Sequence, residues 1–344
     1  MKLRCAAALL AVTGFALAGC TAAVNAPAHT PIASSAATPP PHGTIVFRQF
    51  VDAGNSQGAL FTEQTDGTHK VQLTKPAPGE TDAQPDWSPD GTKIIFTKLT
   101  GTGTPDEDHH IELMNADHTN PVALTSRTST GTINFNDQAV FSPDGKQIAY
   151  AHGGGDVKAD QLKDTGIYVM NADGSNPHEV VTMPPYGGDV GGIAWSPDGT
   201  QLLYGVRNSG TGKPSGGRAF FLVKADGSNN HQLTKWELAA DGTPGWSAAT
   251  NLIVFRVAPD EGSGVGNFYT MRPDGTALTQ VTKFTGTVVS HKVGFSPDGT
   301  WIVFGAASKD GVVRVKLASI DGSHTVALIP DGQASSGADW SNSH

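Results

Sequence analysis

One run in the sequence, Asp106-Glu107-Asp108-His109-His110, consists of residue types that bind metal ions. Carboxylate oxygens and imidazole nitrogens are common ligands of zinc. Neighbouring side chains of an extended chain point to opposite faces, so only the alternate set Asp106, Asp108 and His110 could converge on one ion. An exposed polar loop explains the same run without a metal. We therefore predict neither a metal site nor a cofactor.

A second run, Gly54-Asn55-Ser56-Gln57-Gly58, matches the Gly-x-Ser-x-Gly pattern of a nucleophilic serine. Such a serine stands on a sharp turn from a strand into a helix. The residues that follow, Ala59-Leu60-Phe61-Thr62, are instead typical of a strand. We expect a loop at this position and predict no catalytic residue.

The serines and aspartates of a repeated turn are a third candidate for catalysis. The pattern Trp/Phe-Ser-Pro-Asp-Gly occurs at 87–91, 141–145, 195–199 and 295–299, with shortened copies at 246–247 and 340–341. Proline suits the second position of a tight turn, aspartate bonds to nearby backbone, and glycine adopts the left-handed conformation. Because a hairpin turn requires these residue types anyway, we predict that they are structural.

The segments around these turns are predicted to be β-strands. The turn serines are 45 to 54 residues apart, and each turn precedes a short apolar run such as Ile94-Ile95-Phe96. A second turn in each repeat, such as Ala172-Asp173-Gly174-Ser175, indicates a hairpin of third and fourth strands. Four strands at this period predict an all-β fold, a six-bladed β-propeller of four-stranded blades.

The two ends of the repeated region complement each other. The last copy, Asp339-Trp340-Ser341, stops after one strand, whereas Thr44-Ile45-Val46-Phe47 begins as a second strand. We predict that the N- and C-terminal strands pair in one blade and close the ring, which leaves no open sheet edge at the seam.

These repeats resemble the WD-like repeats of the TolB-type propeller family, in which a Trp/Phe-Ser-Pro-Asp-Gly motif marks each blade. The resemblance extends over residues 43–344. It implies a six-bladed propeller. The α/β domain that precedes the propeller of TolB has no counterpart in this sequence, so the resemblance does not imply the role of TolB in an envelope-spanning complex.

Residues 1–19 are predicted to be a lipoprotein signal peptide. Lys2 and Arg4 precede an uncharged run that is too short to span a bilayer. The run ends in Leu17-Ala18-Gly19-Cys20, which resembles the lipobox of bacterial lipoproteins and implies that Cys20 carries a diacylglyceryl thioether. Soluble secretion is the alternative. Residues 20–42, rich in Pro, Ala, Ser and Thr, are predicted to be the tether between this lipid and the propeller at 43–344.

Charge and cysteine content limit the partners. The net charge is −9, and it becomes −11 when the signal peptide takes Lys2 and Arg4 with it. No basic cluster remains for phosphates, so we predict no nucleic-acid partner. The two cysteines, Cys5 and Cys20, leave no thiol for a disulfide in the mature chain. We expect a monomer that contacts the membrane through its N-terminal lipid.

The binding face is predicted at the end of the propeller where the long and variable loops gather. Counting back from the aromatic residue of each inner strand identifies candidates near the mouth of the central channel. They are Asp82, Gln84, Asn136, Asp137, Gln138, Asp189, Asp241, Thr243, His291, Lys292 and Ser336. This ring is predicted to be polar and mainly acidic, with His291 and Lys292 as a basic spot.

These features together predict a lipid-anchored, extracytoplasmic propeller of the bacterial envelope, on the cell surface or the periplasmic side. It would be a non-catalytic scaffold that binds an envelope protein or a small ligand. The alternative is an enzyme, a lyase or hydrolase that acts on carbohydrate or peptide at the channel mouth. Loss of turnover on substitution of Asp82, Asp137 or His291 would favour the enzyme.

Overall fold

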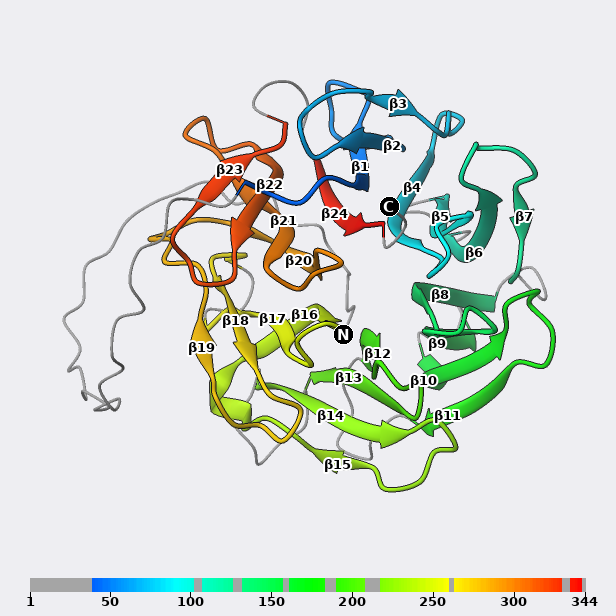
Figure 1. Ribbon diagram of the computed structural model, residues 1–344. Helices are drawn as coiled ribbons and strands as arrows, with labels where there is room; N and C mark the ends of the chain where they lie inside the picture. Colours follow the sequence, from blue (N-terminus) through cyan, green and yellow to red (C-terminus); the bar gives the residue numbers. More distant parts are fainter. Residues whose placement is uncertain are drawn as a thin grey trace, which may run out of the picture. The chain divides into compact units, whose positions relative to one another are not determined.

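The computed structural model describes residues 39–101, 107–125, 132–156, 161–182, 190–207, 217–259, 263–329 and 335–341. These residues form 24 strands and one 3-10 turn, η1 (Trp236–Leu238). The strands fall into six groups of four that are arranged around a ring (Figure 1). The prediction of an all-β, six-bladed propeller is confirmed. Among the described residues, no helix is both long and apolar enough to span a bilayer.

The first three blades follow the order of the chain, apart from one strand. Blade 1 contains β24 (Ser335–Trp340), β1 (Thr44–Phe50), β2 (Gly58–Gln64) and β3 (Val71–Gln72). Blade 2 contains β4 (Glu80–Trp87), β5 (Lys93–Thr100), β6 (Asp108–Asn115) and β7 (Val122–Ala123). Blade 3 contains β8 (Thr132–Phe141), β9 (Gln147–Asp156), β10 (Gln161–Asn171) and β11 (His178–Thr182).

The other three blades have the same order from the channel outward. Blade 4 contains β12 (Val190–Trp195), β13 (Gln201–Arg207), β14 (Arg218–Lys224) and β15 (His231–Gln232). Blade 5 contains β16 (Ala240–Trp246), β17 (Ile253–Val257), β18 (Asn267–Met271) and β19 (Thr279–Gln280). Blade 6 contains β20 (Val289–Phe295), β21 (Trp301–Ala307), β22 (Val313–Ser319) and β23 (Thr325–Ala327).

The Ser-Pro-Asp-Gly turns have the structural role that the sequence predicts. In the turn between β4 and β5, the Asp90 carboxylate accepts hydrogen bonds from Ser88 Oγ at 2.6 Å and from the backbone N–H of Thr92 at 3.0 Å. Gly91 has a φ of +67° and donates its N–H to the carbonyl of Ser88. The aspartate is therefore occupied within its own turn, where these hydrogen bonds lower its pKa.

The ring closes at blade 1 as predicted. Strand β24 pairs antiparallel with β1, with Trp340 opposite Ile45 and Asp339 opposite Val46. Figure 1 shows the last strand of the chain between β1 and the channel, in the place of an inner strand. The N-terminal and C-terminal segments of the propeller thus share one sheet.

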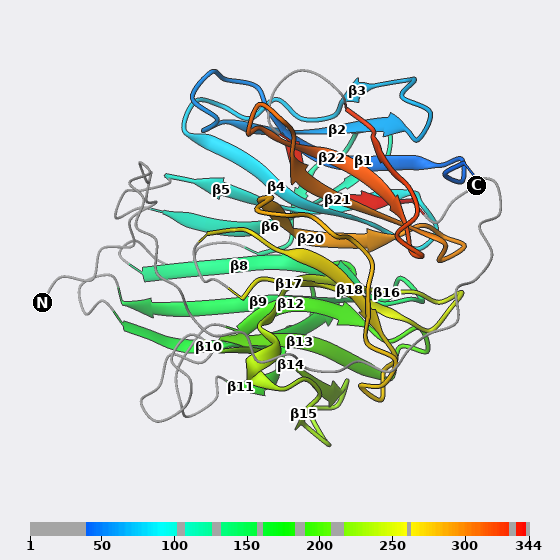
Figure 2. The same cartoon turned by 90° about the vertical axis from the view of Figure 1, so that its left-hand side faces the viewer.

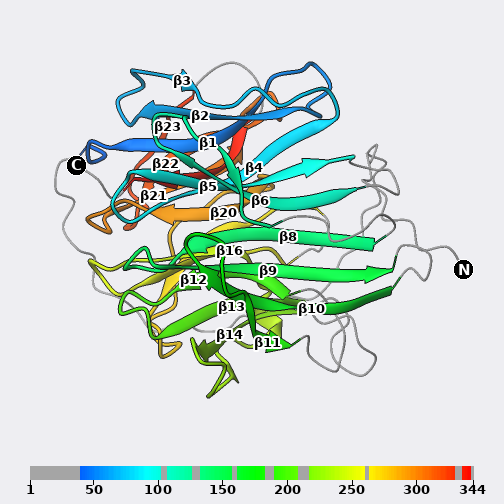
Figure 3. The ribbon, with the colours of Figure 1, turned by 90° about the vertical axis from the view of Figure 1, so that its right-hand side faces the viewer.

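Two pairs of neighbouring blades are also joined to each other by backbone pairing. Strand β6 runs parallel to β8 for two residue pairs, Asp108 with Asn134 and His109 with Phe135. Figures 2 and 3 show β8, β9 and β10 side by side. Two of the segments that are predicted from the sequence to be long, variable loops, 97–110 and 152–166, are shorter as loops in the structure. Much of 97–110 and 152–166 is strand, because β5 and β9 continue beyond their apolar triplets and β6 and β10 begin early.

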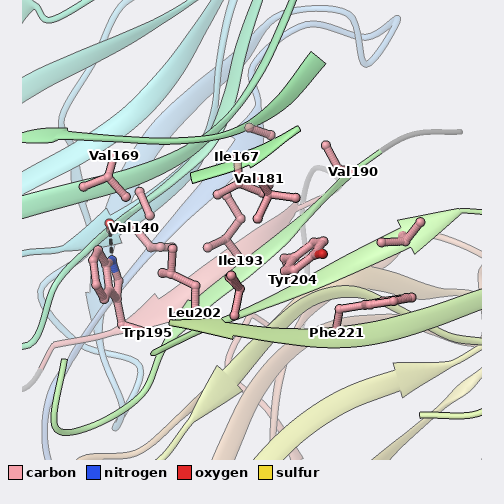
Figure 4. Packing of buried hydrophobic residues seen from close by; sticks show 14 of the residues in the cluster. Val140, Ile167, Val169, Val181, Val190, Ile193, Trp195, Leu202, Tyr204 and Phe221 are labelled. Carbon is pink, nitrogen blue, oxygen red and sulfur yellow. Dashed lines mark hydrogen bonds between the residues drawn. The ribbon is translucent and has the colours of Figure 1, made fainter. Parts of the chain in front are cut away.

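Apolar faces pack between adjacent blades. Figure 4 shows the layer between blades 3 and 4, where Ile167 and Val169 lie against Leu202 and Tyr204. Trp195 is 6 % exposed, and its indole N–H donates to the carbonyl of Val140 at 3.4 Å. Burial of about 150–250 Å² of such a ring at ~25 cal/mol per Å² contributes roughly 4–6 kcal/mol. One large side chain at the end of an inner strand thereby fixes a blade against its neighbour.

Candidate functional site

Each inner strand has an irregularity that directs residues into the channel. The register between the first and second strands shifts in all six described blades, for example between Ala83 and Asp86 and between Asp137 and Val140. Gln84 and Gln138 have positive φ values of 52° and 56° at these bulges. A left-handed conformation costs a non-glycine residue roughly 1–2 kcal/mol, so the bulges hold these side chains in place at an energetic cost.

The bulges form a narrow waist in the channel. We define the waist as the six residues that stand four positions before the turn serine of each inner strand: Gln84, Gln138, Gly192, Thr243, Lys292 and Gly337. Two of their side chains reach across the channel. The Gln138 amide oxygen accepts from the backbone N–H of Gly192 and lies 3.5 Å from Thr243 Oγ1. Lys292 of blade 6 reaches Asp86 in blade 2, at 3.0 Å.

An upper cavity of about 830 Å³ opens on the long-loop side of the waist. Seven of the residues that line it are glycines, which have no side chain to fill the space. The charged residues in the wall are Arg48, Arg207, Arg218, Asp241 and Lys292, and His291 lies among them. A concave site with a few polar groups and valine-rich walls is the usual form of a ligand pocket.

Asp241 is fully engaged in ion pairs. The Arg256 guanidinium donates to both carboxylate oxygens of Asp241, with Nε 2.5 Å from Oδ1 and Nη2 2.6 Å from Oδ2. Arg218 contacts the same carboxylate. Asp241 and Arg256 are 5 % and 2 % exposed, so the pair is desolvated and bidentate. A carboxylate bound in this way cannot act as a general base, and its role is to position the two arginines.

His291 lies in the wall next to these arginines. Although the His291 residue is exposed, partial desolvation of its imidazole and the nearby cations Arg256 and Arg218 lower the pKa of His291 to about 4. His291 is therefore neutral at neutral pH. The expected basic spot contributes the charge of Lys292 but none from His291.

Arg48 contributes a guanidinium from β1. Its Nη2 donates to Ser336 Oγ at 2.8 Å, and its guanidinium carbon lies 4.6 Å from the centre of the Phe50 ring. Its Nε is buried and has no hydrogen-bond partner among the described residues. Burial lowers the pKa of Arg48, and the charge of Asp137 opposes the shift.

The structure brings seven of the predicted binding residues together at the upper cavity. They are Gln84, Gln138, Asp241, Thr243, His291, Lys292 and Ser336. Asp82, Asn136 and Asp137 do not line the cavity, and Asp189 lies outside the described residues. Counting back along each inner strand identified residues at the level of the cavity along the channel axis. It did not give the direction of each side chain, because the bulges alter the alternation.

Asp82 is buried inside blade 2. Asp82 is fully buried, and neither of its carboxylate oxygens has a hydrogen-bond partner among the described residues. The nearest cation is Lys98, whose Nζ lies 3.6 Å from Oδ1. Burial raises the pKa of Asp82, while Thr74 and Lys98 oppose the shift. Asp82 therefore lies on the face of blade 2 beside Lys98 and does not line the upper cavity.

Asp137 lies beside a histidine of the neighbouring blade. His109 Nδ1 is 3.1 Å from Asp137 Oδ2, and His109 Nε2 is 2.9 Å from Glu107 Oε1. Burial acts to lower the pKa of His109, but the two carboxylates outweigh it and raise the pKa. Asn136 is held in the same region, 2.8 Å from His152 Nδ1. These residues connect blades 2 and 3.

Among the described residues of the candidate metal run, only the second half, Asp108 to His110, belongs to a strand. Asp106 lies outside the described residues. Asp108 and His110 belong to β6, and Asp108 Oδ2 lies 3.0 Å from His110 Nδ1. The expected exposed loop is thus wrong for this half, since Asp108 is 8 % exposed. Within the described ranges, no three His, Cys, Asp or Glu side chains are placed to share a metal ion.

The prediction of a mainly acidic ring is wrong for the described residues. The cavity wall contains four cationic side chains and one carboxylate, Asp241. The cations that the sequence prediction missed, Arg48, Arg207 and Arg218, come from second and third strands, whereas the prediction considered only inner strands. A usable signal was present, because Arg48 follows the apolar triplet Ile45-Val46-Phe47 directly, as Arg256 follows Ile253-Val254-Phe255.

A smaller cavity of about 290 Å³ lies beyond the waist, at the end with the Ser-Pro-Asp-Gly turns. Asp86, Lys292 and Asp339 line it together. Asp339 Oδ2 accepts from the backbone N–H of Trp87 at 3.0 Å. Burial and the neighbouring charge of Asp86 raise the pKa of Asp339 to about 7, although Lys292 acts in the opposite direction. The waist separates this cluster from the upper cavity.

Comparison with known proteins supports the architecture. A model of the WD domain, G-beta repeat, matches residues 278–315. The structure is similar to that of TolB from Acinetobacter baumannii, with a TM-score of 0.64, 17 % identity, and coverage of 87 % of this chain and 66 % of that one. This chain therefore spans just under two thirds of that TolB.

Two further structures extend the comparison. A protein described as putative TolB from Agrobacterium tumefaciens has a TM-score of 0.59 and 18 % identity, over 86 % of this chain and 92 % of that one. An oligogalacturonate lyase in complex with manganese has a TM-score of 0.52 and 16 % identity, over 79 % of this chain and 76 % of that one. At such low identity these similarities show a shared fold. The chain is a β-propeller whose fold is similar to that of TolB over most of this chain.

Proposed function

We propose that this protein is a non-catalytic binding module whose ligand occupies the upper cavity. The observation that supports this most directly is the cavity itself, about 830 Å³ in volume and floored by the waist. Its polar groups are suited to holding a ligand. Asp241 is held by arginines, and among the described residues no carboxylate forms an ion pair with neutral His291 that would make it a base.

The proposal includes a membrane location. The lipobox-like sequence at residues 17–20 supports lipid attachment at Cys20, and the fold shared with TolB is compatible with an extracytoplasmic propeller of the bacterial envelope. Mass spectrometry of the mature N-terminus tests this part. A lipid-modified Cys20 supports the anchor, whereas an unmodified N-terminal residue other than Cys20 contradicts it.

Binding in the cavity can be tested with a substitution that fills the cavity with a large side chain. Wild-type protein purified from its native membranes is examined by mass spectrometry for a molecule that co-purifies with it. The variant Val312→Trp places a large ring in the cavity wall, and Val326→Trp adds the same ring on the outer strand β23. We expect Val312→Trp to lose the bound molecule and Val326→Trp to retain it. Equal retention by both variants would contradict a ligand in this cavity.

A second function is supported by His109. This imidazole lies between the Glu107 and Asp137 carboxylates, an arrangement that suits general acid–base catalysis by a lyase or hydrolase on carbohydrate or peptide. The test compares turnover of oligosaccharide and peptide libraries by the wild type and by His109→Gln. Turnover that the substitution abolishes would favour the enzyme over the binding module.

A further inference from the structure

We propose that the upper cavity binds a ligand through a carboxylate, and that Arg48 of β1 is the group that recognises it. The inference rests on the proposed binding function and specifies the chemistry of the ligand. It concerns one edge of the cavity, where Arg48, Phe50, Val312 and Ser336 all line the wall.

Arg48 has a charge that its surroundings do not pair. Among the described residues, no carboxylate lies within the 4.0 Å that defines an ion pair with its guanidinium. The charge of Asp137 acts on it from beyond that distance. Its only hydrogen bond to a described residue is the one from Nη2 to Ser336 Oγ. A largely buried cation without a close counter-ion is costly, and an anionic ligand would remove this cost.

Three cations in or beside the cavity wall differ from Arg48 in this respect. Arg256 is held by Asp241 in a bidentate pair, and Arg218 contacts the same carboxylate. Lys292 is directed at Asp86 across the waist. Arg207, which also lines the cavity, is exposed. Arg48 is therefore the largely buried cation in the wall for which the described protein supplies no ion-pair partner.

The neighbours of Arg48 favour a carboxylate attached to an uncharged, partly apolar body. The centre of the Phe50 ring lies 4.6 Å from the guanidinium carbon, and both residues line the cavity. Ser336 accepts a hydrogen bond from Arg48, so its own hydroxyl proton can be donated to a second ligand oxygen. A guanidinium matches the two oxygens of a carboxylate, while Val312 and Phe50 offer apolar surface beside them.

The test uses two probes of the same shape, benzoate and its neutral analogue benzamide, with inorganic phosphate as a third. Ligand-observed NMR titration measures their dissociation constants with the full-length protein. We expect benzoate to bind about tenfold or more tightly than benzamide, because a hydrogen bond to a charged group is worth about 1.5–3 kcal/mol. We expect Arg48→Gln to remove this preference.

Three controls make the result specific. Arg48→Lys keeps the charge without the planar fork, and we expect it to retain part of the preference. Arg272→Gln removes an exposed arginine in the β18–β19 turn and should leave benzoate binding unchanged. A circular-dichroism spectrum and melting temperature close to those of the wild type show that Arg48→Gln is folded.

The inference is overturned if benzoate and benzamide bind equally or neither binds, if Arg48→Gln binds benzoate like the wild type, or if phosphate binds more tightly than benzoate. These outcomes are distinct from failure of the binding module. If Val312→Trp loses a co-purified molecule while benzoate shows no preference, the binding function stands and only its carboxylate chemistry fails.

Discussion

Asp241 and Arg256 form a bidentate ion pair between the inner and second strands of blade 5, with N–O distances of 2.5 and 2.6 Å. Both residues are almost completely buried. Removal of one member of such a pair leaves the other charge in the protein without compensation, which typically costs about 3–5 kcal/mol. The pair thus contributes to the stability of the cavity wall, which Asp241 lines.

We expect Arg256→Met to lower the free energy of unfolding by about 3–5 kcal/mol, because Asp241 then keeps only Arg218. Urea denaturation followed by tryptophan fluorescence measures the change. Lys146→Met is the control, since it breaks an exposed pair with Asp144 and should cost about 0–1 kcal/mol. A similar loss in the two variants would contradict the importance of the buried pair.

The Asp339 carboxylate should make stability depend on pH. Its pKa in the folded protein is about 7, above the value of 3.8 for a free aspartate, so the folded state binds this proton more tightly. The contribution to stability is complete below pH 3.8 and is lost as the pH rises through 7. We expect Asp339→Asn, which is uncharged at every pH, to gain stability relative to the wild type between pH 5 and pH 8.

Urea unfolding of the wild type and Asp339→Asn at both pH values measures this difference. The groups that face Asp339 are Asp86, Lys292 and the backbone of Trp87 and Trp340. The amide oxygen of Asn accepts from the backbone N–H of Trp87 in place of the carboxylate, so the substitution keeps this hydrogen bond. A difference between the two proteins that stays constant from pH 5 to pH 8 would show that Asp339 does not titrate in this range.

The His291 imidazole should make stability depend on pH in the opposite direction from Asp339. Its pKa in the folded protein falls from 6.5 to about 4, so its contribution to stability is present above pH 6.5 and is lost as the pH falls toward 4. We expect His291→Gln to lose less stability than the wild type between pH 7 and pH 4. His231→Gln, an exposed residue of β15, is the control for the loss of a histidine. Identical acid sensitivity of wild type and His291→Gln would contradict this assignment.

Gly242 should tolerate no side chain. Its φ is +83°, and a Cβ added there would lie 2.1 Å from the carbonyl oxygen of His291 on the next inner strand. Gly311 has a similar φ of +78° with nothing within 4 Å of such a Cβ. We expect Gly311→Ala to cost roughly 1 kcal/mol for its conformation, and Gly242→Ala to cost clearly more because two strands must move apart. Thermal unfolding of both variants tests this. Equal losses of stability would show that the backbone conformation alone, and not the close contact with His291, determines the cost.

The sequence was sufficient to predict the architecture because the repeat has one structural meaning. Asp90 and Gly91 are required by a tight turn, and Trp87 by the packing of one blade on the next, so their spacing reveals the blade period. The pairing of β24 with β1 followed from the count of strands at the two ends. These are local requirements that each copy repeats.

The site was less predictable because it depends on departures from the repeat. Gln84 and Gln138 adopt left-handed backbone conformations that cannot be predicted from their residue type. As a result of the bulges, Gln84 lines the cavity, whereas Asp82 lies beside Lys98 on the face of blade 2. Arg48 reaches the cavity from a second strand, and its lack of a counter-ion is a property of the folded ring.

The pairing of β24 with β1 has a kinetic consequence. Most strand pairs join segments that are close in sequence, so each blade can form early and independently. Trp340 must instead find Ile45 across almost the whole domain, and long-range contacts of this kind form slowly because they close a long loop of chain. Blade 1 should therefore be the last to form, and folding should show a slow phase that reports on Trp340.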